Sequence, residues 1–465
     1  MKEYDFAVIG GGSAGYAAAA TASRLGLRTI CIEGGPEVGG LCILRGCMPS
    51  KTILESANRF LTLRRAKEFG LSAGQIGYDA AAIRERKRGL IGEFAGYRRS
   101  QLEHGKFEFV RAHASFSSPN ALRLVTLEGK EMEIPIRSAL IATGSELNLL
   151  EIPGLAETSF LHSDLALDAD VVPPSVVILG GGAVALEFAS FYSSLGSKVT
   201  VVQRSPQFLK EADADVAGAL TEALRQHGVE MICDTQLLRV AAEKGEKAVY
   251  FLHGGVERRV AADELFYALG RRPSVAGLDL KAAGVKLSPS GAIQVNDSMQ
   301  TSQPHLFAAG DVAGLYEVVH LAVEQGVMAA KNAQRLLHGK ELGRIDYRLN
   351  LFAVFSHPQL ALVGLTERDA INQNIPFRTA SYPFADHGKS LVRGEPEGFV
   401  KLMVHSESGE ILGAAAVGPE VSELIHEIVV AMYFRATASD LVSIPHYHPT
   451  LSEIWTYPAE ELAEA

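Results

Sequence analysis

Two cysteines stand five positions apart in the segment GGLCILRGCMPSK (residues 39–51), in a chain that has only four cysteines among its 465 residues. In a regular α-helix, Cα atoms five residues apart are separated by about 8–9 Å, whereas a disulfide needs about 4.4–6.8 Å. We therefore expect Gly46 to permit a local distortion that brings Cys42 and Cys47 together. A disulfide across so short and strained a loop is easily reduced, which predicts a redox pair and not a structural bond.

Metal binding is the alternative use of these two thiols. The nearby sequence offers no second cluster of cysteine or histidine that completes a four-ligand set, so we predict no metal site. Arg45, two positions before Cys47, could favour a thiolate in a working pair. The other cysteines, Cys31 and Cys233, are isolated, so the chain has no disulfide framework of the kind found in secreted proteins.

Two stretches of similar pattern, residues 5–33 and 175–203, must supply the framework around this pair. Each has a hydrophobic strand, a glycine turn, an alanine-rich helix and a second strand, with its first glycine 23 positions before the end of the second strand. Two such patterns predict two dinucleotide-binding units, because glycines allow close backbone approach and the helix N-terminus offers N–H groups to a pyrophosphate. The binding positions of the two turns are Gly10, Gly12 and Gly15 in the first, and Gly180, Gly182 and Ala185 in the second.

The residues that end the two second strands predict different nucleotides. Glu33 can accept hydrogen bonds from both hydroxyls of an unphosphorylated ribose, as in FAD or NAD, whereas it would repel a 2′-phosphate. The second unit has Gln203 at this position, followed by Arg204 and, a short turn later, Lys210. Two cations there favour NADPH over NADH. The alternative is that Arg204 and Lys210 are ordinary exposed cations.

Further glycine turns follow strand-like segments at LIATGSE (140–146), FYALGRRPS (266–274) and HLFAAGDVAG (305–314). Asp311, on the last of these turns, could hold a sugar-alcohol hydroxyl of a cofactor, although an Asp is also common in ordinary turns. The cofactor-binding set is completed by Gly40, Thr143, Gly144 and Gly270.

These patterns predict an α/β protein with two Rossmann-like dinucleotide-binding domains, for FAD and for NAD(P), and a C-terminal α+β domain. The expected order is the first part of the FAD-binding domain at 1–150 and the NAD(P)H-binding domain at 151–275. The chain then returns to the first domain at 276–345 and ends with a terminal α+β module at 346–465.

Charge and hydropathy argue against two classes of partner. A formal net charge of −10 gives no electrostatic footprint for nucleic acid, and the basic run RERKRG (84–89) indicates the solvated face of a helix. The longest apolar runs are interrupted by glycines and are shorter than the roughly 20 residues that cross a bilayer. The N-terminal residues show neither a secretory signal nor a transit peptide, so we expect a cytoplasmic protein.

Over its whole length the chain resembles the class I pyridine nucleotide-disulfide oxidoreductases, the family of dihydrolipoamide dehydrogenase, glutathione reductase and mercuric reductase. The resemblance rests on the two glycine fingerprints, the C-x4-C-x-P-x-K segment, AAGD, and HYHPTLSE near the end. It implies FAD, a nicotinamide cofactor and an active homodimer, with residues 346–465 as the dimerisation or interface domain.

The resemblance also implies roles for individual residues. Cys42 would be the interchange thiol that meets the substrate disulfide, and Cys47 would lie against the flavin and form the charge-transfer complex. Lys51 would pair with Glu187 beside the flavin ring.

His448 would be the general acid/base, held by Glu453 and acting on the cysteines of the other subunit. The spacing alone leaves an alternative for Glu453. The residues TLSE (450–453) also match a helix capping box, with Thr450 at the N-cap.

Within the family, HYHPTLSE and VVHLAVEQG (318–326) are more similar to dihydrolipoamide dehydrogenase, whereas Ala185 and Gln203-Arg204 resemble glutathione and mercuric reductases. No cysteine pair follows His448, which disfavours a mercuric or thioredoxin reductase. The cysteine segment departs from the family's usual GGTCxNxGC at Leu41, Leu44 and Arg45, so the resemblance does not identify the substrate.

We therefore predict an FAD-dependent NAD(P)H:disulfide oxidoreductase. It would pass electrons from nicotinamide to FAD, to Cys42–Cys47 and on to a small-molecule or protein-bound disulfide, or run in reverse as in the lipoamide branch. One alternative is a flavoprotein that reduces a metal ion or a quinone directly. Another is a redox-sensing or complex-bound flavoprotein subunit with low turnover.

Overall fold

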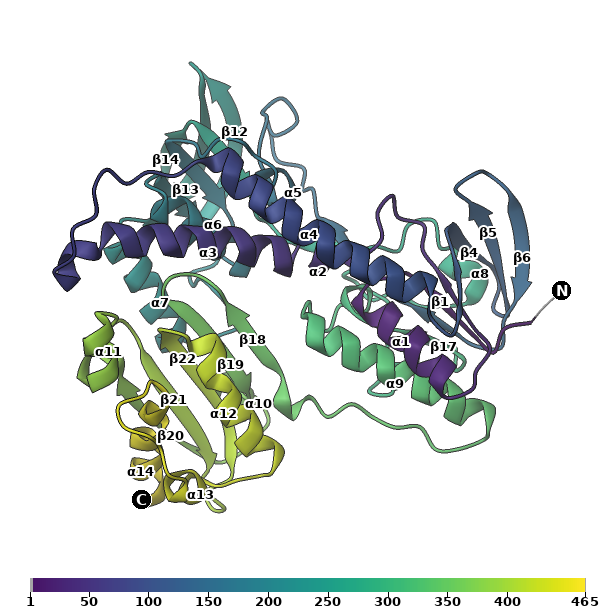
Figure 1. Ribbon diagram of the computed structural model, residues 1–465. Coiled ribbons are helices and arrows are strands. Elements are labelled where there is room, and N and C mark those ends of the chain that lie inside the picture. Colours follow the sequence, from purple (N-terminus) through teal and green to yellow (C-terminus); the bar gives the residue numbers. More distant parts are fainter. Residues whose placement is uncertain (1–2, 465) are drawn as a thin grey trace. The chain divides into compact units, whose positions relative to one another are not determined.

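The computed structural model describes residues 3–464, which form two compact units (Figure 1). The first unit contains the residues up to 50 together with 85–149 and 270–346, and the second contains 51–84, 150–269 and the residues from 347 onward. The chain thus leaves and re-enters the first unit, and each unit holds one of the two glycine turns.

The first unit is built on a parallel sheet with the strand order β17–β7–β1–β2–β3. Its strands are β1 (Phe6–Ile9), β2 (Thr29–Ile32), β3 (Glu108–Val110), β7 (Ala139–Ile141) and β17 (Leu306–Ala308). Strands β1 and β2 are buried throughout, as continuous hydrophobic runs in a parallel sheet must be. Helices α1 (Ser13–Arg24) and α9 (Val319–Leu337) lie side by side against this sheet (Figure 1).

Shorter elements complete the first unit. An antiparallel sheet is formed by β4 (Ala112–Ser118), β5 (Ala121–Thr126) and β6 (Glu131–Pro135), and helix α8 spans Leu280–Ala283. Strand β8 (Ser145–Leu147) pairs antiparallel with β16 (Arg271–Pro273), which joins the points where the chain leaves and re-enters the unit. Because β8 and β16 are paired, the long segment between them is an insertion in the first unit.

The basic run at 84–89 lies within helix α4 (Ala80–Glu103), but the interpretation of it as a solvated face is wrong at one position. Lys87 is buried, with 5% of its surface exposed, while Arg86 and Arg88 on either side are exposed. The reason is helical periodicity, because about one position in each turn of a surface helix faces the protein.

The second unit contains a parallel sheet with the order β11–β10–β9–β15. Its strands are β9 (Ser175–Leu179), β10 (Lys198–Val202), β11 (Glu230–Ile232) and β15 (Glu264–Tyr267). Helices α6 (Ala183–Ser194) and α7 (Ala214–Gln226) follow β9 and β10, and α5 (Ser163–Ala166) precedes them. The antiparallel sheet of this unit consists of β12 (Thr235–Glu243), β13 (Glu246–His253) and β14 (Val256–Ala262).

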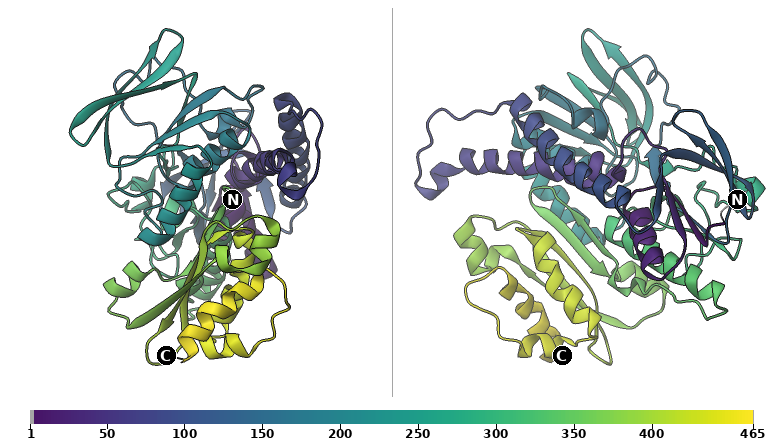
Figure 2. Two further views of the ribbon diagram at one scale, coloured as in Figure 1. Left: turned by 90° about the vertical axis from the view of Figure 1, so that its left-hand side faces the viewer. Right: turned by 45° about the vertical axis from the view of Figure 1, so that its right-hand side comes forward.

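The C-terminal part of the second unit is an antiparallel sheet with the order β18–β19–β22–β21–β20. Its strands are β18 (Leu351–Val354), β19 (Gln359–Gly364), β20 (Phe377–Pro383), β21 (Phe399–His405) and β22 (Ile411–Gly418). Helices α12 (Val421–Tyr433) and α14 (Thr456–Glu464) pack against this sheet (Figure 2), and α13 spans Ala438–Ser443. The predicted fold class, with two dinucleotide-binding sheets and a C-terminal α+β part, is confirmed.

No helix among residues 3–464 is long and apolar enough to cross a membrane.

Candidate active site

The two cysteines of the pair lie on two consecutive helices. Cys42 is within α2 (Gly40–Leu44), and Cys47 is the first residue of α3 (Cys47–Arg64); both are half-buried. Arg45 ends α2 with a φ of −144°, so the helix is interrupted between the cysteines. A Cβ on Gly46 would lie 3.0 Å from the Leu41 carbonyl oxygen and 3.2 Å from the Cys42 Cα. Glycine is needed at the interruption because the backbone before Cys47 approaches that of Cys42.

The cysteine segment packs directly on the first glycine turn. Gly40 has a φ of +73°, and a Cβ there would lie 2.6 Å from the Cα of Gly12. Gly12 is the N-cap of α1 and provides no side-chain cap, so the N–H groups of the first helical turn are left for an anionic ligand beside the cysteine helix. The structure thus brings Gly12, Gly40 and the pair into one region of the first unit.

The other residues predicted for the first nucleotide site gather at the carboxyl ends of β1, β2 and β7. Oε2 of Glu33 accepts a hydrogen bond from Gly11 N at 2.8 Å, and Oε1 accepts one from Gly35 N at 2.7 Å. These bonds fix the carboxylate beside the glycine turn and leave lone pairs for ribose hydroxyls. A Cβ on Gly10 would overlap the Ala142 carbonyl oxygen, and one on Gly15 would overlap that of Gly10, so neither position tolerates a side chain.

Thr143, Gly144 and Asp311 lie where β7 and β17 end and β8 begins. Thr143 Oγ1 donates to the Ser274 carbonyl at 2.6 Å, and Gly144 has a φ of +72°. Asp311 accepts a 2.6 Å hydrogen bond from Ser145 Oγ. The glycine cradle, the free helix N-terminus and the two carboxylates fit a dinucleotide such as FAD, whose pyrophosphate and hydroxyls need these partners.

A cation that the sequence did not reveal lies near Cys42. The Arg98 guanidinium, on α4, stacks 4.3 Å from the Tyr16 ring centroid, and its Nε donates to Gln101 at 3.1 Å. Its Nη1 is buried without a hydrogen-bond partner among residues 3–464. Burial lowers the pKa of Arg98, while the nearby Tyr16 and Cys42 act to raise it. Arg45, in contrast, forms an ion pair with Glu37. No local signal links Arg98 with Cys42, because α4 is far from α2 in the sequence.

The second nucleotide site has the same turn with different surroundings. A Cβ on Gly180 would overlap the Ala268 carbonyl oxygen, as in the first turn, whereas one on Gly182 would meet no described atom within 4 Å. Ala185 is buried in α6, and Gly270 has a φ of +100°.

At the end of β10, Gln203 turns back on its own backbone, with Oε1 accepting from Arg204 N at 2.9 Å. The Arg204 and Lys210 side chains are exposed and form no ion pair within the part of the chain that the structure describes. They are available to an anionic group at this turn.

Lys51 and Glu187 are paired in the second unit. Lys51 Nζ donates to both carboxylate oxygens of Glu187, at 2.8 and 2.9 Å. Glu187 is 5% exposed, and its Oε1 also accepts from Phe355 N at 3.0 Å. Lys51 Nζ lies 4.6 Å from the Phe355 ring centroid. The pair has a fixed position because the α3 residues Ile53 and Leu54 share one core with α6.

His448 and Glu453 form a second pair in this unit. His448 Nδ1 donates to Oε2 of Glu453 at 3.0 Å; the imidazole is 77% exposed and the carboxylate is 10% exposed. The capping-box alternative is wrong, because the 3₁₀ turn at Ser452–Trp455 has Leu451 as its N-cap and no side-chain cap. The carboxylate of Glu453 faces histidine instead.

Sequence reasoning missed a further histidine at this carboxylate. His387 has no exposed surface, and its Nε2 lies 3.4 Å from Oε1 of Glu453. Its position, some 60 residues before His448, gives no local signal of this contact.

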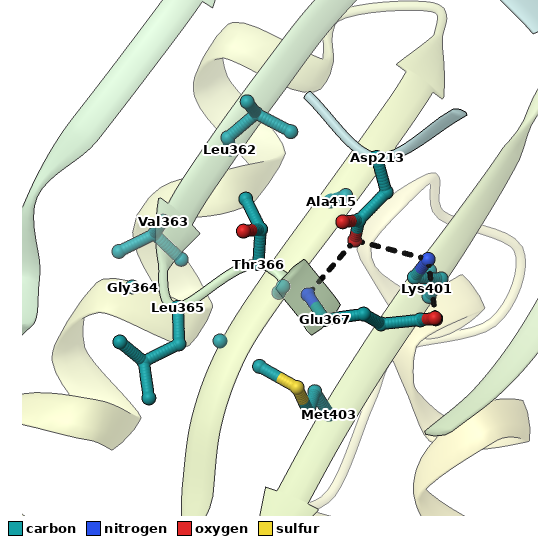
Figure 3. A pocket seen from close by; sticks show the side chains of 12 residues that line it. Asp213, Leu362, Val363, Gly364, Leu365, Thr366, Glu367, Lys401, Met403 and Ala415 are labelled. Atoms are coloured by element: carbon teal, nitrogen blue, oxygen red, sulfur yellow. Dashed lines mark hydrogen bonds and ion pairs between the residues drawn. The ribbon is translucent and has the colours of Figure 1, made fainter. Parts of the chain in front are cut away.

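The small cavity in Figure 3 is lined by a structural cluster of charged side chains and is not a substrate pocket. Lys401, on β21, contacts Asp213 at 3.2 Å and Glu367 at 2.7 Å (Figure 3), and it also contacts Asp215 at 2.9 Å. Burial alone would lower the pKa of Lys401, but these carboxylates outweigh it and raise the pKa. The cavity volume is about 20 Å³, far below the roughly 300 Å³ at which ligand pockets begin. No group of three histidine, cysteine or acidic side chains arranged for a metal ion occurs in the described residues.

Comparison with known proteins assigns this arrangement to a family. The pyridine nucleotide-disulphide oxidoreductase family matches residues 4–326, and the dimerisation domain of the same family matches residues 352–459. The chain therefore belongs to the pyridine nucleotide-disulphide oxidoreductases. It is a flavoprotein oxidoreductase that acts on sulfur groups and uses FAD and a pyridine nucleotide, as the sequence predicts.

Individual relatives point in the same direction. The dihydrolipoyl dehydrogenase of Bacillus subtilis is 35% identical over 449 residues, which cover 96% of each chain. That of Mycobacterium tuberculosis is 34% identical over 456 residues, which cover 97% of each chain. Among solved structures, the HOCl-induced flavoprotein disulfide reductase RclA of Escherichia coli, in its Cu(II) complex, has a TM-score of 0.86 at 27% identity, covering 99% of this chain and all of that one. LpdA of Mycobacterium tuberculosis has a TM-score of 0.87 at 26% identity, with coverage of 99% and 100%.

Proposed function

We propose that Cys42 and Cys47 form the redox pair through which this enzyme reduces a disulfide substrate, or oxidises the corresponding dithiol in reverse. The observation that carries the proposal is the contact of Gly40 with Gly12, which seats the cysteine helix on the first glycine turn. FAD, when bound there, supplies two-electron transfer between the nicotinamide and the pair. The remaining chemistry belongs to side chains of this chain.

In the disulfide-reducing direction, the Cys42 thiolate attacks one sulfur of the substrate and displaces the other as a thiolate, which takes a proton from His448. The Cys47 thiolate then attacks the Cys42 sulfur of the mixed disulfide. This second step re-forms the Cys42–Cys47 bond and releases the second substrate sulfur as a thiolate, which takes up a proton from solvent. One disulfide is thus reduced to two thiols while one dithiol is oxidised. Arg98, near Cys42, favours the attacking thiolate.

His448 acts in this scheme as the acid/base of a homodimer, reaching the pair of the other subunit. Support comes from its high exposure, the carboxylate of Glu453 on its inner nitrogen and the dimerisation domain that contains both. The Lys51–Glu187 pair holds an ammonium group in a fixed position, and by the family resemblance this group would orient the flavin when FAD is bound.

The second glycine turn takes NADPH in preference to NADH. One support is that the Arg204 and Lys210 side chains are exposed and form no ion pair in the described residues. Another is that Gln203 stands where the first turn has the acidic Glu33, since an arginine beside an uncharged residue at this position suits a 2′-phosphate.

The substrate is a small or protein-bound disulfide, with a lipoyl-type cyclic disulfide as the first candidate because of the dihydrolipoyl dehydrogenase relatives. Reduction of a metal ion at the same thiols is the second candidate. It is favoured by the Cu(II) complex of RclA, a neighbour that covers nearly the whole chain.

An anaerobic titration tests the scheme. The FAD-loaded enzyme is titrated with NADPH and with NADH while long-wavelength charge-transfer absorbance is recorded. The reduced enzyme is then mixed with oxidised lipoamide, glutathione disulfide or Cu(II). We expect faster reduction by NADPH and rapid reoxidation by one of the disulfides. Rapid reduction by NADH alone would overturn the nucleotide preference, and reoxidation by Cu(II) alone would favour the second candidate.

A further inference from the structure

His387 is a buried histidine whose position at Glu453 is unexplained by the proposed chemistry so far. It has no exposed surface, and it lies between Phe384–Asp386 and helix α11 (Gly388–Arg393). Its ring is held edge-on by Phe384 and by Tyr457, with centroid distances of 6.4 and 6.3 Å. The imidazole therefore has a single orientation set by packing.

The two ring nitrogens of His387 face different partners. Nδ1 lies 2.9 Å from Ser390 Oγ, and Nε2 lies 3.4 Å from Oε1 of Glu453. Nε2 has no hydrogen-bond partner of normal length in residues 3–464. A buried polar group left without a partner costs about 1–3 kcal/mol, and the Glu453 carboxylate is the acceptor that can offset this cost.

One tautomer satisfies this geometry. The Ser390 hydroxyl donates to Nδ1, which leaves the proton on Nε2, where it faces the negatively charged Glu453. Burial lowers the pKa of His387 although Glu453 opposes this, so the ring stays neutral near pH 7. His448 Nδ1 lies within hydrogen-bond distance of both oxygens of Glu453, nearer to Oε2 at 3.0 Å than to Oε1 at 3.2 Å.

We propose that His387 is a positioning residue, whose Nε2–H holds Oε1 of Glu453 so that Oε2 stays directed at His448. The inference rests on the proposed acid/base role of His448. The order of contacts is Ser390, His387, Glu453 and His448, from the buried interior to the exposed imidazole. Catalytic hydrogen bonds are often long before substrate binds, and the 3.4 Å contact shortens when charge develops on His448.

Two matched substitutions separate positioning from packing. Gln places a side-chain amide near the position of Nε2, whereas Asn retains a polar group only near Nδ1. We expect His387→Asn to slow reoxidation of the reduced enzyme by about tenfold, and His387→Gln to stay within about twofold of the unmodified enzyme. Flavin reduction by the nicotinamide, which needs no His448, stays unchanged in both variants and shows that they are folded and loaded with FAD.

The measurement is stopped-flow absorbance of the two half-reactions in the FAD-loaded enzyme. The oxidant is oxidised lipoamide, or glutathione disulfide if that reoxidises the unmodified enzyme faster. His227→Asn is the control, because His227 makes a similar 3.7 Å contact with Glu397 that does not involve Glu453. It should leave both half-reactions unchanged.

A double substitution shows whether His387 acts through Glu453. In a Glu453→Gln background, His387→Asn should add less than about a twofold effect. Reoxidation at the unmodified rate in His387→Asn, or a full tenfold effect in the Glu453→Gln background, would overturn the inference. If Glu453→Gln and His448→Gln themselves leave reoxidation unchanged, the proposed acid/base role fails instead.

Discussion

The two glycine turns start from the same backbone geometry and differ at the third glycine position. Gly10 and Gly180 both have a strongly positive φ, of 107° and 120°, and both approach a carbonyl oxygen of a neighbouring strand end. At the third position, a Cβ on Gly15 would overlap the Gly10 carbonyl, whereas the second turn holds a buried alanine, Ala185. The helix of the first turn therefore lies closer to its strand.

The turns differ again in what stands beside them. In the first, Glu33 is bound to two backbone N–H groups and the cysteine helix packs on Gly12. In the second, the Gln203 side chain accepts a hydrogen bond from the next backbone N–H, and no described atom lies within 4 Å of a Cβ placed on Gly182. The crowded turn suits a permanently bound cofactor next to the redox pair, and the open turn suits a nucleotide that enters and leaves.

The largest effect should come from the third glycine. Gly15→Ala forces a methyl group into a backbone carbonyl, so we expect a loss of about 3 kcal/mol or more in the free energy of unfolding and protein without FAD. Thermal unfolding and the flavin absorbance of purified protein measure this. The control, Ala185→Gly, should cost only about 1 kcal/mol. A Gly15→Ala protein with full FAD and normal stability would contradict the comparison.

Glu33 should come next. Glu33→Ala removes the acceptor of two backbone N–H groups and the proposed acceptor of the ribose hydroxyls, each bond being worth about 1.5–3 kcal/mol for a charged acceptor. We expect the Kd for FAD to rise by roughly 100-fold, measured by flavin fluorescence during reconstitution of apoprotein. Gln203→Ala should bind FAD normally. Equal FAD loss in both variants would show that the two strand ends do not differ in role.

The nucleotide preference should show a smaller change. Arg204→Ala removes one of the two cations proposed to contact a 2′-phosphate, so kcat/KM for NADPH should fall about tenfold while that for NADH stays within about twofold. Lys210→Ala should act in the same direction, and Gln203→Glu should favour NADH. Steady-state assays with both nucleotides decide this. If neither cation matters, Arg204 and Lys210 are ordinary surface residues.

The smallest effect concerns the two cysteines outside the pair. Burial raises the pKa of the Cys31 thiol, on β2, so it stays protonated well above neutral pH and supplies no thiolate to an alkylating agent. Cys233, just after β11, is partly exposed. Iodoacetamide at pH 8 should modify Cys233 and leave Cys31 intact, as peptide mass spectrometry can determine. Early labelling of Cys31 in folded protein would contradict the tight packing of the first unit.

The sequence predicted those features that depend on local pattern. Repeated strand–turn–helix segments specify the two parallel sheets, and the five-residue spacing of Cys42 and Cys47 required the helix break that occurs at Gly46. Contacts between residues that are far apart in the sequence could not be predicted from local pattern. Arg98 lies near Cys42 only because of how the elements pack in the folded protein. The contact of His387 with Glu453 has the same origin.

Two local sequence patterns, TLSE and the basic run at 84–89, allowed interpretations that the structure does not support. The TLSE segment satisfies a capping pattern, yet its glutamate turns to His448 because a carboxylate–imidazole contact is available there. Lys87 belongs to a basic run, but helical periodicity buries it. A tertiary contact thus decides the role of Glu453, whereas the position of Lys87 on its helix decides its burial.

The central claim is that electrons leave the flavin through Cys42 and Cys47, and Cys47→Ser tests it most directly. Steady-state disulfide reduction and nicotinamide-driven flavin reduction are measured on the same FAD-loaded preparation. We expect disulfide turnover to fall by more than about a hundredfold while the flavin is still reduced at a similar rate. Full disulfide reductase activity in Cys47→Ser would contradict the account.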